Sequence, residues 1–150
     1  MSTTNILFVC LGNICRSPMA EFIMKNIVAN DGKSPDFIIS SAATSDEEQG
    51  NGIHYGTRKV LTDKGIPFTQ DFARKITKED YCKYDYIIGM DQSNIRDMLA
   101  FFGGDPQNKI RLLLSFTEDN RSVADPWYTG NFEKTYNDIL LGCRALYQSI

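Results

Sequence analysis

Two reactive side chains, a thiol and a guanidinium, lie close together near the N-terminus. Cys10 and Arg16 bound a segment that reads CLGNICR and is followed by Ser17 and Pro18. A deprotonated cysteine is a nucleophile, and the planar fork of an arginine binds two oxygens of a phosphate group. A cysteine and an arginine at this spacing also occur by chance. The pair therefore indicates phosphate chemistry only if the fold presents both side chains to one anion.

The predicted setting of this segment favours anion binding. A buried strand is predicted over 5–9 and a helix over 18–29, so the segment connects a strand to a helix N-terminus. Backbone N–H groups at such a junction form a cup for a tetrahedral anion, and their positive potential favours a thiolate at Cys10. Gly12 and Asn13 tolerate the left-handed backbone angles that a tight cup requires.

Each polar residue of the cup has a predicted task. Arg16 binds phosphate oxygens, Asn13 pins the loop through side-chain hydrogen bonds, and Ser17 donates a hydrogen bond to the sulfur of Cys10. The implied reaction is in-line attack by Cys10 on phosphorus, followed by hydrolysis of the phosphocysteine by water. Oriented amides and Arg16 would stabilise charge on the equatorial oxygens.

A candidate proton donor lies far along the chain. Asp125, on a loop stiffened by Pro126, is placed to protonate the leaving oxygen and then to deprotonate the attacking water. Trp127 and Tyr128 would flank an aromatic leaving group. The alternatives are that Asp125 only caps a turn and that the two aromatic residues belong partly to the core.

The elements that must position these residues alternate between strand and helix. Strands are predicted over 5–9, 37–41, 84–90 and 110–114, and helices over 18–29, 54–64, 92–101 and 131–147. This order predicts one three-layer α/β domain over residues 1–150, a four-stranded parallel sheet with helices on both faces. The loops that start at Cys10, Ala42, Asp91 and Ser115 should converge beyond the carboxyl ends of the strands.

Composition excludes several other classes of protein. The 150 residues are 42% hydrophobic and 23% charged, which is typical of a globular chain, and the net charge of −3 disfavours nucleic acid and anionic membranes as partners. Four cysteines are too few for a disulfide scaffold, and the single histidine, His54, is too little for a multi-histidine zinc site. Neither a membrane span nor a signal peptide is predicted, so we expect a cytoplasmic location.

Taken together, these motifs resemble the low-molecular-weight protein tyrosine phosphatases. The resemblance is carried by residues 10–18, 41–45, 73–77, 90–94 and 125–126. It implies a phosphate-binding loop after the first strand, no metal and no cofactor. It also implies hydrolysis of phosphotyrosine in proteins and of small aryl phosphates. The expected partners are phosphotyrosine-containing proteins, and the expected state is a monomer or a weak homodimer.

The resemblance also assigns roles to individual residues. It implies Cys10 as nucleophile, Arg16 as phosphate clamp, Asp125 as general acid, and Asn13, Ser17 and Ser41 as the supporting network. The implied phosphate-binding loop consists of Leu11, Gly12, Asn13, Ile14, Cys15 and Arg16. Cys15 matches a second loop cysteine that pairs reversibly with the nucleophile under oxidation, although a packing role is equally compatible with its position. Cys82 and Cys143 are predicted to be core residues.

The chain departs from the family pattern in two regions near the predicted pocket. Residues 46–49 read DEEQ where many members carry an aromatic residue, and a carboxylate at Glu47 would favour different residues around the phosphotyrosine. Some eukaryotic members add a histidine to the supporting network in the region of residues 68–72. Here Gln70 or Asp71 takes that role, or no residue does.

Three other functions compete with tyrosine phosphatase activity. An arsenate reductase would need two further cysteines as a disulfide relay; Cys82 is present, but Gly89 stands where a nearby partner is wanted. Relatives that prefer phosphoarginine have threonine where this chain has Ile14. A phosphotyrosine-binding module without catalysis would gain nothing from a nucleophile at Cys10.

Overall fold

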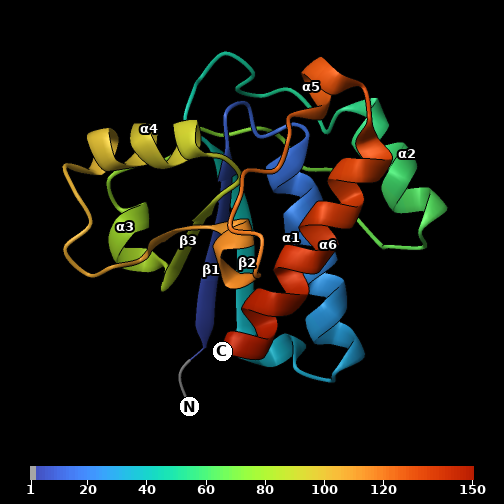
Figure 1. The fold of residues 1–150 in the computed structure, drawn as a ribbon, viewed down its shortest axis with the longest axis horizontal. Helices are drawn as coiled ribbons and strands as arrows, with labels where there is room; N and C mark the ends of the chain where they lie inside the picture. The colour runs from blue at the N-terminus through green and yellow to red at the C-terminus, as the bar shows by residue number, and fades with distance from the viewer. Residues whose placement is uncertain (1–2) are drawn as a thin grey trace.

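The computed structural model describes residues 3–150. Residues 1 and 2, which the predicted domain includes, lie outside the described residues. A four-stranded parallel sheet in the order β2-β1-β3-β4 forms the middle layer (Figure 1). Its strands are β1 (Thr4–Cys10), β2 (Phe37–Ala43), β3 (Tyr86–Gly89) and β4 (Ile110–Leu112). The predicted α/β architecture is therefore confirmed.

Helices cover both faces of this sheet. On one side lie α1 (Arg16–Asn30), α2 (Tyr55–Asp63) and α6 (Phe132–Ser149), and on the other lie α3 (Asp80–Lys83) and α4 (Gln92–Phe102) (Figure 1). The shorter elements are the 3-10 helices η1 (Ser34–Asp36) and η2 (Leu113–Phe116) and the single turn α5 (Pro126–Thr129). None of the helices within residues 3–150 is both long and apolar enough to cross a membrane.

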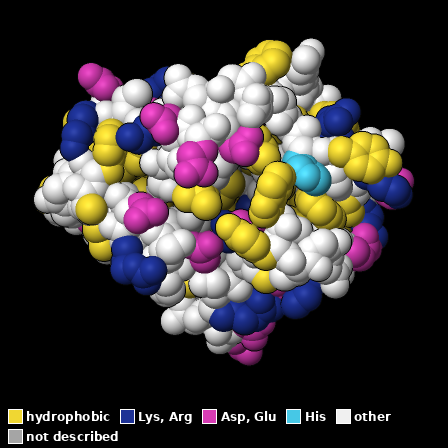
Figure 2. Space-filling view, turned by 90° about the horizontal axis from the view of Figure 1, so that it is seen from above, with side chains coloured by type: hydrophobic (Ala, Val, Ile, Leu, Met, Phe, Trp, Pro, Cys, Tyr) yellow, Lys and Arg dark blue, Asp and Glu magenta, His cyan; other side chains and the backbone are white. Residues whose placement is uncertain are grey.

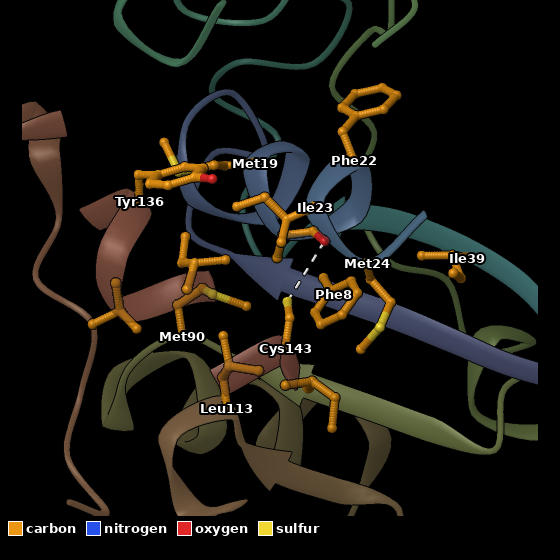
Figure 3. Packing of buried hydrophobic residues seen from close by; sticks show 14 of the residues in the cluster. Phe8, Met19, Phe22, Ile23, Met24, Ile39, Met90, Leu113, Tyr136 and Cys143 are labelled. Atoms are coloured by element: carbon orange, nitrogen blue, oxygen red, sulfur yellow. Dashed lines mark hydrogen bonds between the residues drawn. The ribbon is translucent and has the colours of Figure 1, made fainter. Parts of the chain in front are cut away.

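The alternation of side chains along β1 creates two separate cores. Ile6 and Phe8 belong to the cluster beneath α1 and α6, whereas Leu7 and Val9 belong to the cluster beneath α4. All four are fully buried, as expected for a central parallel strand covered on both faces. The predicted burial of Cys143 is confirmed, and its thiol lies 3.8 Å from the carbonyl oxygen of Ala20 (Figure 3).

Helix α1 is buried on all sides over its first half. Every residue of 16–24 is buried, because the sheet, α2 and α6 all contact this helix. Such burial requires polar side chains on the helix to find partners inside the protein. Arg16, Ser17 and Glu21 are the polar residues concerned, and each has a buried partner near the strand ends.

The structure corrects the predicted elements in several places. β3 begins at Tyr86 rather than at residue 84, and β4 ends at Leu112 because the chain turns there into η2. In that turn the side chain of Leu113 packs against α6 so closely that a Cβ at Gly142 would lie 2.5 Å from it. The short helices α3 and α5 were not predicted. Cys82, on α3, is exposed, so its predicted place in the core is wrong.

The order of the strands determines where the loops meet. β1 has β2 on one side and β3 on the other, and such a switch point leaves a crevice beyond the carboxyl ends of the strands. Backbone hydrogen bonds tie the loops together there. Thr44 N donates to Cys10 O at 3.0 Å, and Val123 N donates to Met90 O at 2.8 Å. The predicted convergence of the loops is therefore observed.

Candidate active site

The loop between β1 and α1 wraps around the sulfur of Cys10. The backbone N–H of Asn13 donates to Cys10 Sγ over 3.3 Å, and Asn13 adopts a left-handed angle, φ 59°. Gly12, by contrast, does not have a positive φ, so the expectation of a left-handed angle there is wrong. Its lack of a side chain matters for space instead, because a Cβ at Gly12 would lie 3.2 Å from Cγ of Glu48.

The hydroxyl of Ser17 is directed at the sulfur of Cys10. The two atoms are 3.1 Å apart, and both side chains are buried. Asn13 Nδ2 donates to Ser17 Oγ at 2.8 Å, which occupies a lone pair of that oxygen and leaves its proton free. The other acceptor in reach, the carbonyl of Ala42, is farther away at 3.4 Å. This arrangement favours a hydrogen bond from Ser17 to the sulfur.

Behind the loop a chain of hydrogen bonds leads through a buried carboxylate to the surface. Asn13 Nδ2 also donates to Ser41 Oγ at 3.0 Å, and Ser41 donates to Glu21 Oε1 at 2.6 Å. Lys25 Nζ lies 2.7 Å from the other carboxylate oxygen of Glu21. Burial raises the pKa of Glu21, and the hydrogen bonds from Lys25 and Ser41 act in the opposite direction.

Sequence reasoning missed Glu21 entirely. The available signal was its spacing of four residues from Lys25, which places the two on neighbouring positions of a helix. Within the described residues, the predicted alternatives, Gln70 and Asp71, make no hydrogen bond to Asn13, Ser41 or Glu21. Asp71 contributes only a charge that raises the pKa of Glu21. Glu21 is therefore the residue that accepts the hydrogen bond from Ser41 in the network that supports the loop.

The guanidinium of Arg16 lies between two carboxylates from distant parts of the chain. Its Nη1 atom donates to Asp91 Oδ2 at 2.7 Å and to the carbonyl of Val123 at 2.9 Å. Its Nη2 atom lies 3.4 Å from Asp125 Oδ2. The side chain is buried, and within residues 3–150 its Nε has no hydrogen-bond partner. One edge of the guanidinium is thus anchored, and the other is available to an anion.

Asp91 has two functions in the structure. It caps α4, accepting the backbone N–H of Asn94 at 2.8 Å. It also anchors Arg16, which the sequence did not indicate. Burial alone would raise the pKa of Asp91, but hydrogen bonds from Ser93 and Arg16 and from a backbone amide outweigh it, so that the pKa lies below the usual aspartate value.

The cavity above the sulfur holds about 150 Å³ and opens on the face shown in Figure 2. Its lining combines the loop with residues that are remote in sequence: Cys10, Leu11, Gly12, Ile14, Cys15, Arg16, Ser45, Glu47, Glu48, Asp125, Trp127 and Tyr128. On this face, acidic side chains lie on one side of the hollow and apolar side chains on the other (Figure 2).

Asp125 and the two aromatic residues form one wall of this cavity. Asp125 Oδ1 caps α5 by accepting the N–H of Trp127 at 3.0 Å, and Oδ2 is turned toward Arg16, so Asp125 caps a turn and also faces the cavity. Trp127 and Tyr128 are 58% and 78% exposed, which contradicts the alternative of a partly buried pair. These exposed rings can contact a ligand that enters from solvent.

His54 connects the loop to the aromatic wall. Its backbone N–H donates to the carbonyl of Ile14 at 2.8 Å, and its side chain caps α2. Its ring stacks on Phe132 at 5.1 Å and meets the edge of Trp127 at 5.6 Å. Sequence analysis had no indication of these contacts.

The remaining cysteines differ sharply in environment. Cys15 lines the cavity but is 5% exposed, and burial, with the nearby charges of Cys10 and Asp125, raises its pKa to about 12. Cys82 precedes Asp85, whose N–H pairs with Asn5 at the start of β1. Cys82 therefore lies near the amino end of β1, whereas the loop with Cys10 follows the carboxyl end of β1. Across residues 3–150, no three His, Cys, Asp or Glu side chains are grouped to hold a metal ion.

A thiol in a strand–loop–helix cup, with a guanidinium and a carboxylate at the same cavity, defines a cysteine-dependent phosphatase. The family model for low molecular weight phosphotyrosine protein phosphatase matches residues 5–150. The chain is 41% identical over 148 residues to the low molecular weight protein-tyrosine-phosphatase YfkJ of Bacillus subtilis, covering 97% of this chain and 95% of YfkJ. The chain belongs to the low molecular weight phosphotyrosine protein phosphatase family.

Other relatives extend this comparison. The human low molecular weight phosphotyrosine protein phosphatase is 39% identical over 152 residues, which cover 98% of this chain and 96% of the human protein. The crystal structure of YfkJ matches with a TM-score of 0.96 over 100% of this chain and 96% of its own. A structure described as DARP, drosophila arginine phosphatase, matches with a TM-score of 0.85 at 32% identity over 96% of both chains.

Proposed function

We propose that this protein hydrolyses phosphotyrosine in proteins, and small aryl phosphates, through a phosphocysteine intermediate on Cys10. One observation carries the proposal. The sulfur of Cys10 receives hydrogen bonds from the N–H of Asn13 and the hydroxyl of Ser17, and it shares a cavity with Arg16 and Asp125. Both donors are directed at the sulfur, which lines the cavity.

In the first step the Cys10 thiolate attacks phosphorus in line with the leaving tyrosine oxygen. The S–P bond forms as the P–O bond breaks, and Asp125 gives its proton to the departing phenolate. Arg16 binds two of the three equatorial oxygens through its free edge, and the loop amides bind the rest. Because Arg16 is already held by Asp91, little conformational entropy is lost when the anion binds.

In the second step water hydrolyses the phosphocysteine. Asp125, now ionised, accepts a proton from the water as its oxygen attacks phosphorus, and the S–P bond breaks to release inorganic phosphate. The hydroxyl of Ser17, 3.1 Å from the sulfur, stabilises the departing thiolate. Trp127 and Tyr128 provide the aromatic wall against which a phenyl ring packs.

We also propose the context in which this reaction takes place. The partners would be phosphotyrosine-containing proteins, with neither nucleic acid nor a membrane involved, and the protein would be a cytoplasmic monomer or weak homodimer. The net charge of −3 and the carboxylates of Glu47 and Glu48 at the cavity mouth support partners other than nucleic acid.

Arsenate reduction and phosphoarginine hydrolysis have less support. A disulfide relay would have to carry Cys82 from the amino end of β1 to its carboxyl end, where Cys10 lies. The cavity wall contains the apolar side chain of Ile14, where relatives that prefer phosphoarginine have threonine.

The test is a pH–rate profile with para-nitrophenyl phosphate for the wild type and for Cys10→Ser, with orthovanadate binding measured in parallel. We expect an acid optimum for the wild type, and no turnover but retained vanadate binding for Cys10→Ser. Turnover by Cys10→Ser would contradict the mechanism. Phosphotyrosine and phosphoarginine peptides are then compared with the wild type, and faster release from phosphoarginine would reverse the choice of substrate.

A further inference from the structure

A second cavity, larger than the one above Cys10, opens on another side of the molecule. Its volume is about 450 Å³, and it lies between α1, β2 and the connection that follows α2. Its lining consists of Phe22, Lys25, Asn26, Val28, Ala29, Ser34, Phe37, Ile39, Pro67, Phe68 and Thr69. None of these residues lines the cavity above Cys10.

The walls of this cavity are mostly apolar. Phe22 is a buried member of the core cluster that contains Leu113 and Cys143 (Figure 3), and it meets the ring of Phe68 edge to face at a centroid distance of 6.1 Å. Ile39 closes the wall from β2. A concave surface of aromatic and aliphatic side chains with a few polar groups at its mouth is typical of small-molecule sites.

The charge at this cavity identifies the kind of ligand. Lys25 is the one charged side chain in the lining, and its Nζ lies 5.1 Å from the ring centroid of Phe22. Its side chain is 44% exposed, so the ammonium can turn toward the cavity when it gives up its ion pair with Glu21. A cation beside an apolar surface complements a ligand with an anionic group on a hydrocarbon body.

Lys25 also belongs to the hydrogen-bond chain that ends at the nucleophile. Its ammonium holds Glu21, which accepts from Ser41, which in turn accepts from Asn13. A ligand carboxylate that binds Lys25 would draw it away from Glu21. The buried carboxylate of Glu21 would then lose the cation that compensates its negative charge. Without that cation, Glu21 would be a weaker hydrogen-bond acceptor for Ser41.

We propose that this cavity binds a small apolar carboxylic acid, with its carboxylate on Lys25 and its hydrocarbon packed against Phe22 and Phe68. Occupancy lowers turnover at Cys10 by weakening the contact of Lys25 with Glu21. The binding of the acid is independent of the proposed phosphatase function, whereas its effect on turnover rests on that function.

Binding is tested with 4-phenylbutyrate, and 4-phenylbutanol serves as the uncharged match. Amide chemical shifts are recorded by NMR with the catalytic loop saturated by inorganic phosphate. We expect shifts in α1 and in residues 67–69, and binding of the alcohol at least five-fold weaker. Shifts confined to residues 10–16 and abolished by phosphate would show binding at the catalytic loop and overturn the proposal. Equal binding of the alcohol would overturn the assignment of an acid.

Matched variants separate the site from general effects. Ala29→Trp and Thr69→Trp fill the cavity from two different elements and should each weaken 4-phenylbutyrate binding at least ten-fold. Ala100→Trp, on the exposed face of α4, should leave it unchanged. Lys25→Met should remove the preference for the acid over the alcohol. Lys59→Met, which breaks an exposed pair of the same helical spacing, should not. Unchanged binding in folded Ala29→Trp and Thr69→Trp would refute the site.

The coupling is measured as turnover of para-nitrophenyl phosphate. Saturating 4-phenylbutyrate should lower kcat several-fold with little change in KM, because the effect reaches Cys10 through its supporting network and not through competition. Lys25→Met should lower kcat in the same direction and should be insensitive to the ligand. Bound ligand with unchanged kcat would refute the coupling and leave the site. Absence of all turnover would refute the proposed function, while the NMR arm would still measure binding.

Discussion

Asn13 combines a left-handed backbone angle with three side-chain hydrogen bonds, and two substitutions separate these contributions. Its amide nitrogen donates to Ser17 and Ser41, and its carbonyl oxygen accepts from the backbone N–H of Arg74 at 3.2 Å. Asn13→Ala removes the hydrogen bonds and leaves a Cβ at a φ of 59°. Asn13→Gly removes the same hydrogen bonds and also relieves the backbone strain.

The expected losses follow from these contacts. Each of the three hydrogen bonds contributes about 1 kcal/mol to the free energy of unfolding, and the left-handed angle costs an alanine roughly 1 kcal/mol. We therefore expect Asn13→Ala to lose about 4 kcal/mol and Asn13→Gly to lose about 3 kcal/mol. These are large fractions of the roughly 5–15 kcal/mol that is typical of a folded domain.

Urea denaturation measures both losses, and the rate with para-nitrophenyl phosphate is measured in the same samples below the unfolding transition. Both variants should lose at least ten-fold in kcat/KM. The backbone N–H that donates to the sulfur of Cys10 belongs to Asn13, and without the side-chain hydrogen bonds this N–H is no longer held in place. If the alanine variant were as stable as the glycine variant, backbone strain at this position would be refuted. If either retained full activity, the loop would not depend on this side chain.

Three further substitutions test the surroundings of the loop. Asp125→Asn should slow phenyl phosphate about 100-fold but para-nitrophenyl phosphate far less, because only the poorer leaving group needs the proton; equal losses would contradict the general-acid role. Asp91→Asn should cost about 2–3 kcal/mol of unfolding free energy at pH 7. Since the pKa of Asp91 is lowered on folding, this difference should shrink as the pH falls below about 4 in urea titrations, and a constant difference would refute the pairing with Arg16. In peptide kinetics the wild type should prefer basic over acidic residues beside phosphotyrosine by about three-fold, and Glu47→Lys should reverse this preference. A preference that the substitution leaves unaffected would exclude Glu47 from substrate selection.

The sequence alone predicted those features that are built from residues close together in the chain. The strand, the loop and the helix of residues 4–30 are contiguous, so residue types and spacing are enough to place Cys10, Ser17 and Arg16 around one anion. The parallel sheet followed from the alternation of apolar runs with amphipathic segments. Pattern reasoning failed where an element is short, as with α3 and α5.

Only the tertiary structure decided which distant groups meet. Arg16 contacts carboxylates that are 75 and 109 residues away, and the structure alone brings Glu21 to Ser41 and thereby to the loop. These contacts depend on strand order and on the way in which crossover connections bring loops to one end of the sheet. No local spacing encodes that arrangement, because a side chain's partner across the sheet is determined by the packing of all the layers together.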